Sequence, residues 1–250
     1  MMRADLLKST LARLRRKLSF PEQEELRTMF YAQFMGENDL TFDIGANVGN
    51  RTVVFARLSR IVVAVEPQDG CLAVLRNQFG GNPKVKLVHK AVGPQEGQAE
   101  IFLCNANCLS SFSPGWIAAV RKSGRFAGLQ WSHKHTVGVT TLDKLITQFG
   151  MPTFIKIDVE GYEYEVLQGL SRPVKALSFE FVPEYVQYSY RCVDHLSSLG
   201  KVRFNYSMGE CMQLALPTWV ATAELKRRLS QFTYSPAVWG DIYARFDVVG

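Results

Sequence analysis

The sequence predicts an α/β fold built on a doubly wound, mostly parallel sheet of seven strands. From residue 40 onward, short runs rich in Val, Ile and Phe alternate with longer amphipathic segments. A turn with two glycines at residues 43–49 closes the first apolar run, and an acidic residue closes the second. Strands that alternate with helices imply crossover connections and parallel pairing. Ligands of such sheets bind beyond the carboxyl ends of the strands.

Length and composition fit one large domain with a small appendage. The chain has 250 residues, of which 47% are hydrophobic and 21% are charged, as in ordinary globular proteins. We expect an N-terminal helical extension over residues 1–36 and a main domain over residues 37–250. The main domain is expected to carry an insertion at about residues 104–136, where the alternation of strands and helices breaks.

The positive charge is concentrated at the N-terminus. The chain has a formal net charge of +6, and residues 1–20 hold six basic side chains against one acidic side chain. The remainder is nearly neutral, which argues against nucleic acid as a partner. Leucines at residues 7, 11, 14 and 18 recur at helical spacing and predict an amphipathic basic helix. This helix either packs against the domain or makes a weak contact with a membrane surface or a partner.

The cysteines favour a reducing compartment. Five cysteines are scattered along the chain, an odd number, and no secretory signal precedes them. No apolar run approaches the roughly 20 residues that cross a bilayer. We therefore expect a cytoplasmic protein.

Hydrophobic spacing defines the remaining elements. A second N-terminal helix is expected to start at Pro21, where acidic residues of the first turn suit the helix dipole. Seven apolar runs are expected to form the sheet, at residues 40–44, 61–66, 85–89, 153–158, 174–181, 202–206 and 241–246. Six amphipathic segments are expected to be helices, at about residues 49–59, 69–79, 141–149, 162–170, 184–199 and 219–230. Strands at 98–103 and 137–141 flank an irregular stretch, which is suited to be a substrate lid.

The turn after the first strand has the spacing D-x-G-x-N-x-G. Gly45 and Gly49 let the backbone approach a ligand closely before a helix begins. Asn47 stands where a nicotinamide-binding loop has its middle glycine, which argues against a dinucleotide. Asp43 suits a ligand with an amine or a water shell, and S-adenosylmethionine carries both an amine and a sulfonium. This turn is therefore a candidate cofactor loop.

Glu66 closes the second strand, 23 residues after Asp43. A carboxylate at this position can accept hydrogen bonds from both ribose hydroxyls of an adenosyl group. Taken alone, it would be an ordinary exposed glutamate at the end of a strand. The glycine turn upstream favours the ribose-binding role.

A longer motif resembles the FkbM family of methyltransferases. The match is strongest in F-I-K-I-D-V-E-G-Y-E at residues 154–163, with T-T-L-D at 140–143 and H-K-A-V-G at 89–93. The resemblance runs from about residue 40 to residue 182. It implies a class I methyltransferase (Rossmann-like) fold, S-adenosyl-L-methionine as the donor, and an oxygen of a sugar, polyketide or other secondary metabolite as the usual acceptor. Some relatives methylate an amide nitrogen.

The resemblance also implies further cofactor contacts. Residues after the third strand, including Ala91 and Val92, would border the adenine. Ser110 and Ser111 are similar to a serine-containing stretch near the cofactor, although a plain loop is an alternative.

Three acids are candidate catalytic residues. Asp158 ends an apolar strand, and it either holds the methionine end of the cofactor or takes the acceptor's proton. Glu160 either contacts the acceptor or caps the next helix. Glu180 lies between two phenylalanines, where a carboxylate is costly unless it is paired or faces the cleft, so it is a second candidate base.

The chemistry requires no metal, so none is predicted, although these three acids could gather around a divalent cation. The acceptor pocket is expected to be built from aromatic residues of the insertion and the C-terminal third: Trp116, Trp131, Tyr185 and Tyr188. Two other hypotheses are a nicotinamide oxidoreductase, which Asn47 opposes, and a scaffold that acts through the basic N-terminal helix.

Overall fold

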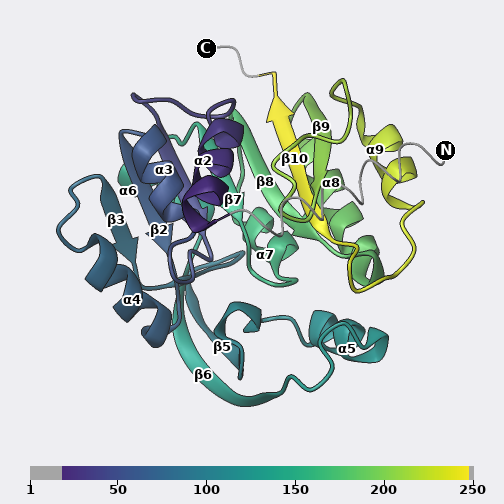
Figure 1. The fold of residues 1–250 in the computed structure, drawn as a ribbon, viewed down its shortest axis with the longest axis horizontal. Coiled ribbons are helices and arrows are strands. Elements are labelled where there is room, and N and C mark those ends of the chain that lie inside the picture. Colours follow the sequence, from purple (N-terminus) through teal and green to yellow (C-terminus); the bar gives the residue numbers. More distant parts are fainter. Residues whose placement is uncertain (1–18, 248–250) are drawn as a thin grey trace.

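The computed structural model describes residues 19–247. A seven-stranded sheet has the order β3-β2-β1-β7-β8-β10-β9 (Figure 1). Its strands are β1 (Leu40–Ile44), β2 (Ile61–Val65), β3 (Val85–Val88), β7 (Phe154–Ile157), β8 (Ala176–Phe181), β9 (Val202–Met208) and β10 (Gly240–Phe246). The neighbouring strands from β3 to β8 are parallel, and β10 runs antiparallel to both β8 and β9. The predicted seven-stranded, mostly parallel sheet is confirmed, with strand ends shifted by one or two residues.

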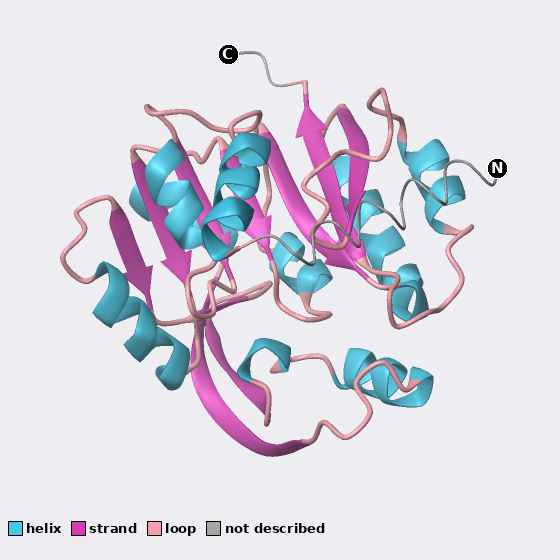
Figure 2. Ribbon diagram, in the orientation of Figure 1, coloured by secondary structure: helices cyan, strands magenta, loops and turns pink. Residues whose placement is uncertain are grey.

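Helices cover both faces of this sheet (Figure 2). One face packs against α2 (Phe20–Tyr31), α3 (Thr52–Leu58) and α4 (Asp69–Phe79). The other packs against α6 (Leu142–Phe149), α7 (Glu163–Gln168), α8 (Val186–Leu199) and α9 (Thr222–Leu229). The segment predicted as one helix at 184–199 is divided into a 3-10 turn, η2 (Pro183–Tyr185), and α8.

Alternating strand residues supply the two cores. Along β7, Phe154 packs in the core beneath α2 and α3, whereas Ile155 packs in the core beneath α6, α7 and α8. The ring centroids of Tyr31, in α2, and Phe34, just after it, lie 5.9 and 5.1 Å from the ring centroid of Phe154. The C-terminal end of α2 is therefore packed on the sheet. The first predicted helix of the extension lies outside the described residues, and the domain boundary at residue 36 stays a prediction.

The strand order reverses between β1 and β7. From β1 the chain builds outward through β2 and β3, and from β7 it builds in the opposite direction. The N–H of Asp158 donates to the carbonyl oxygen of Ile44 at 2.9 Å, so the ends of both strands lie side by side. Crevices at such reversals are where open α/β sheets bind ligands.

A second sheet projects from the body. It consists of β4 (Ala91–Val92), β6 (Trp131–Thr140) and β5 (Gly97–Cys104), with β6 in the centre. The paired strands β5 and β6 extend away from the main sheet (Figure 2). Among residues 19–247, none of the helices has the length and hydrophobicity of a membrane span.

The predicted insertion is more regular than expected. It contains η1 (Asn107–Leu109) and a helix, α5 (Pro114–Ser123), and β6 already begins at Trp131, so the prediction of an irregular stretch was wrong. The Ser113 hydroxyl accepts a hydrogen bond from the Trp116 N–H at 3.1 Å, and Gly124 ends the helix in a left-handed conformation. These are ordinary helix start and stop signals.

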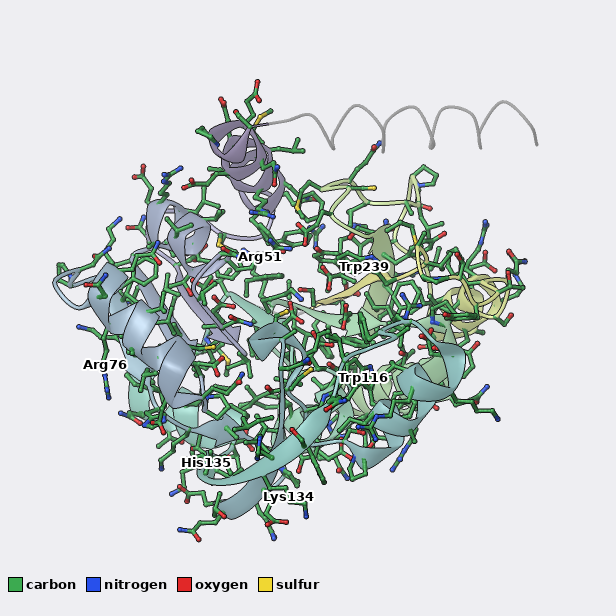
Figure 3. All side chains as sticks on the ribbon, turned by 60° about the horizontal axis from the view of Figure 1, so that its bottom comes forward. Arg51, Arg76, Trp116, Lys134, His135 and Trp239 are labelled. Carbon is green, nitrogen blue, oxygen red and sulfur yellow. The ribbon has the colours of Figure 1, made fainter. Side chains whose placement is uncertain are left out.

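Trp116 of α5, labelled in Figure 3, packs against the loop that follows β7. Its indole is buried and lies on Gly161, the residue that follows Glu160. A Cβ at position 161 would stand 2.2 Å from Cγ of Trp116, and Gly161 has φ +86°. Any side chain at this position would therefore displace the indole.

We expect Gly161→Ala to lower the free energy of unfolding by roughly 2–5 kcal/mol, because a left-handed backbone and a steric clash act together. Gly124→Ala is the matched control: Gly124 has φ +76°, but a Cβ there would meet nothing within 4 Å. The control should lose only about 1–2 kcal/mol. Urea unfolding of both variants checks the difference, and equal losses would show that Trp116 adjusts freely.

Candidate active site

The candidate cofactor loop is wedged between two strands. The N–H groups of Gly45 and Ala46 both donate to the carbonyl oxygen of Val65 at 3.0 Å. A Cβ at Gly45 would stand 1.9 Å from the carbonyl oxygen of Asp158, and Gly45 has φ +80°. Only glycine permits this approach. Gly49 closes the turn, and its N–H donates to the carbonyl oxygen of Ala46 at 2.9 Å.

Glu66 faces the same loop. The N–H of Asn47 donates to Oε2 of Glu66 at 2.8 Å, and the N–H of Gln68 donates to Oε1 at 2.8 Å. The side chain is buried, and burial raises its pKa although both hydrogen bonds oppose the rise. Asn47 takes a left-handed conformation, φ +49°, which asparagine tolerates better than most residues. Each carboxylate oxygen keeps a lone pair for a ligand hydroxyl.

Asp43 lies below the loop rather than on its surface. It is 1% exposed, and its Oδ2 accepts a hydrogen bond from the Thr52 hydroxyl at 2.6 Å. Burial raises its pKa to about 6, partly offset by the Thr52 hydrogen bond. The structure therefore gives Asp43 a supporting place under the loop, and its predicted contact with a cofactor amine stays a prediction.

A buried lysine, not singled out from the sequence, organises the acids. Nζ of Lys156 lies 3.2 Å from Oδ2 of Asp158 and 3.0 Å from Oδ1 of Asp241. Lys156 and Asp241 are buried, whereas the side chain of Asp158 is 40% exposed. Burial lowers the pKa of Lys156, but the two carboxylates outweigh it and leave the pKa well above its usual value. The lysine inside the apolar run F-I-K-I was the sequence signal that could have indicated a buried, paired cation.

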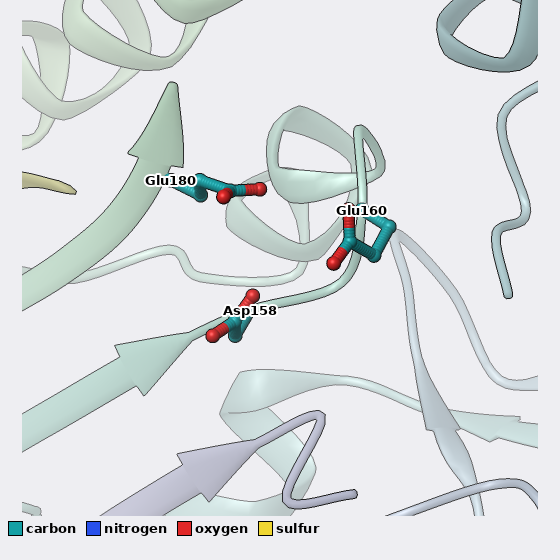
Figure 4. A group of neighbouring side chains, drawn as sticks. All are labelled: Asp158, Glu160 and Glu180. Atoms are coloured by element: carbon teal, nitrogen blue, oxygen red, sulfur yellow. The ribbon is translucent and has the colours of Figure 1, made fainter. Parts of the chain in front are cut away.

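The three predicted catalytic acids do come together (Figure 4). One carboxylate oxygen from each of Asp158, Glu160 and Glu180 lies within 4.8 Å of the others, close enough for a divalent cation to bridge them. Burial, followed by repulsion from Glu180, holds the pKa of Glu160 well above its usual value, and burial with repulsion from Asp158 does the same for Glu180. The expectation that no metal is needed stays a prediction.

The structure differs from two alternative roles of these acids, a helix cap made by Glu160 and a paired Glu180. Glu160 does not cap α7: the N–H of Gly161 donates instead to Oε1 of Glu163, at 3.0 Å. Within residues 19–247, Glu180 has no ion pair or side-chain hydrogen bond with a lysine or a backbone amide. Glu163 was not anticipated from the sequence. It is 5% exposed, and burial raises its pKa to about 7.

The remaining predicted cofactor residues lie in the insertion and on β4. The Ser111 hydroxyl donates to the carbonyl oxygen of Glu160 at 2.6 Å, and the Ser110 hydroxyl donates to Oε1 of Gln68 at 2.9 Å. Both serines thus connect the insertion to the site. Ala91 and Val92 form β4, and their side chains are buried in apolar clusters, so only their backbone is available to a ligand.

The sheet order, the glycine loop after β1 and the acid after β2 define a class I methyltransferase domain. The family model of the methyltransferase FkbM domain matches residues 43–204. The chain belongs to the FkbM methyltransferase family.

Known proteins resemble parts of the chain. The crystal structure of methyltransferase FkbM from Methylobacillus flagellatus KT is similar with a TM-score of 0.50 and 14% identity, over 85% of this chain and 44% of that chain. A stretch of 53 residues is 38% identical to ribosomal RNA small subunit methyltransferase A from Clostridium perfringens, over 21% of this chain and 19% of that protein. The chain therefore spans less than half the length of either protein.

We expect Asp43→Asn to change the pH dependence of stability. An acid whose pKa rises from 3.8 to about 6 on folding favours the folded state at low pH, and this advantage is lost as pH rises through 6. The ionised form costs about 3 kcal/mol at pH 8. Asparagine keeps an oxygen for Thr52 and carries no charge. Asp43→Asn should therefore unfold at a higher temperature than the native protein at pH 8 and at a similar temperature at pH 4. A variant that is less stable at both pH values contradicts this account.

Proposed function

We propose that this chain is an S-adenosylmethionine-dependent methyltransferase that methylates a hydroxyl oxygen of a small-molecule or glycosidic acceptor. The observation that carries the proposal is the loop at residues 43–49, held against the backbone of Asp158 and facing Glu66 at the reversal of strand order. Family membership supports the methyl-transfer chemistry. The choice of a hydroxyl acceptor rests on the family's usual substrates, and methylation of an amide nitrogen is the alternative.

The donor set suits an adenosyl group with a charged tail. Glu66 has lone pairs for two ribose hydroxyls, and the glycine loop leaves backbone within reach of the ligand. Asp158 offers a partly exposed carboxylate that Lys156 holds in place, where an amine or sulfonium is attracted electrostatically. Bound S-adenosylmethionine supplies a methyl group on a positively charged sulfur.

The chain's own residues then align the acceptor and accept its proton. Asp158, oriented by Lys156, holds the reacting groups in line. Alignment of this kind can lower the activation free energy of the reaction by about 7–11 kcal/mol. The Glu180 side chain has no hydrogen bond or ion pair among the described residues, and the charge of Lys156 favours its ionised form. It takes the hydroxyl proton while the oxygen attacks the methyl carbon. A general base of this kind raises the reaction rate by roughly 10²–10⁴-fold. A cytoplasmic location and a contact made by the basic N-terminal residues 1–18 remain part of this proposal.

Two other functions differ in which ligand binds. A nicotinamide oxidoreductase would be stabilised by NADH, and a scaffold by neither NADH nor S-adenosylhomocysteine. A thermal-shift comparison of the two ligands distinguishes these functions from a methyltransferase, which responds to S-adenosylhomocysteine alone.

Glu66→Gln should weaken S-adenosylhomocysteine binding by at least about tenfold, because the charge-assisted hydrogen bonds to the ribose are lost. Glu66→Ala should remove measurable binding, since it also leaves the N–H groups of Asn47 and Gln68 without their acceptor. Glu100→Ala, on the exposed hairpin, is the control. Isothermal titration calorimetry measures the three affinities. Unchanged affinity in both Glu66 variants would sink the ribose assignment.

Glu180→Gln and Asp158→Asn should each lower turnover by roughly 10²–10⁴-fold while S-adenosylhomocysteine still binds to both variants. Turnover is measured as release of S-adenosylhomocysteine with the acceptor found active in a panel of sugars, polyketides and amides. Near-native turnover of Glu180→Gln would place the base elsewhere, and near-native turnover of Asp158→Asn would remove its aligning role.

A further inference from the structure

A small pocket adjoins the acid centre on the side away from the cofactor loop. It is lined by Gly161 and Glu163 at the start of α7, by Glu180 at the end of β8, and by residues of α5, η2 and α8. The space left inside it is about 10 Å³, roughly the space that one bound water molecule occupies. The pocket therefore has room for one small functional group of an acceptor, such as an ammonium group, and not for a ring.

The pocket walls are aromatic. The rings of Tyr185 and Tyr188 are stacked with centroids 4.6 Å apart, and Trp116 closes another side. The hydroxyl of Tyr185 lies 3.3 Å from the hydroxyl of Ser113, which ties this wall to α5. Three of the four aromatic residues expected from the sequence thus line the pocket. Trp131 does not: it packs edge-on against Trp116, and its Nε1–H donates to the carbonyl oxygen of Leu109.

Polar groups in this pocket lack partners. Ser189 is 6% exposed and lines the pocket, and its hydroxyl has no hydrogen bond within the described part of the chain. Glu180 likewise has no ion pair or side-chain hydrogen bond there. Glu180 is half-buried, and polar groups with little access to water gain most from a new hydrogen bond. The unpartnered groups are therefore available to a ligand.

The charges around the pocket are unbalanced. Glu163 and Glu180 line it and Glu160 adjoins it, whereas no lysine or arginine is among the lining residues. Lys156 is engaged by Asp158 and Asp241. Arg191 is exposed and lies over the rings of Tyr164 and Tyr188. Carboxyls without a direct ion pair favour a cation, because a nearby positive charge stabilises their ionised form.

We propose that this pocket binds a protonated amine of the acceptor, so that the substrate is an amino sugar or a related amino alcohol whose hydroxyl is presented to Glu180. The inference rests on the proposed methyltransferase function. A neutral polyol would satisfy Ser189 but would give the carboxyls of Glu163 and Glu180 no cationic partner. A bare divalent cation would gain little from the aromatic walls.

The test compares D-glucosamine with D-glucose, which has a hydroxyl in place of the amine, at pH 7. Binding is measured by ligand-observed NMR with and without S-adenosylhomocysteine, after binding of S-adenosylhomocysteine itself has been measured. We expect glucosamine to bind about tenfold or more tightly than glucose. Failure of S-adenosylhomocysteine to bind counts against the proposed function alone, because the preference for the amine is also measured without it.

Glu163→Gln keeps an oxygen for the Gly161 N–H and removes one charge, and Ser189→Ala removes the unpartnered hydroxyl. Both variants should weaken glucosamine binding severalfold, whereas the control Glu224→Gln, at an ion-paired site on α9, should not. Equal affinity for the two sugars, no glucosamine binding, or unchanged binding in both pocket variants would overturn the proposal. The proposal would also be overturned if MgCl₂ displaced glucosamine from the native protein but not from the Glu180→Gln variant.

Discussion

The ammonium group of Lys156 sets the geometry of the whole acid centre. It reaches from β7 across the face of β8 to Asp241 on β10 and also holds Asp158 at the mouth of the crevice. A buried cation is stable only with its acids in place, and removal of one partner from such a group costs about 3–5 kcal/mol. The same ion pairs leave Glu160 and Glu180 without a direct ion pair among the described residues, although the charge of Lys156 still acts on Glu180. The pairing of Lys156 therefore divides the acids into those that are balanced internally and those that face a ligand.

That division follows the two sides of the crevice. On the cofactor side, Glu66 accepts two backbone N–H groups and Asp43 accepts the Thr52 hydroxyl, so the loop is organised before a ligand arrives. On the other side, Glu180 and Ser189 have no partner within the described residues. The cofactor side is thus organised before binding, whereas polar groups on the side of the methyl acceptor lack partners. This arrangement is consistent with one fixed cofactor and with an acceptor substrate that completes the polar network when it binds.

Local sequence patterns were enough to predict the sheet and to select three acids that the fold brings together. The apolar runs gave all seven strands, and the glycine turn, Glu66 and the three catalytic candidates lie at the carboxyl ends of the strands because parallel pairing puts those ends at one edge. The pairing of Lys156 with Asp241 was not foreseeable, since 85 residues separate them in sequence. The places of Ser111 and Glu163 also depend on how the insertion folds back. By contrast, α5 could have been found from Ser113, Pro114 and Gly124.

The close packing of Trp116 on Gly161 limits which changes of sequence this site can accept. The insertion that carries the indole and the loop that carries Glu160 occupy one another's space, so neither can change alone. A change in one segment that alters the acceptor would therefore need a matching change in the other, although the two are remote in sequence. The cofactor loop belongs to the same block, because Gly45 packs against the carbonyl oxygen of Asp158.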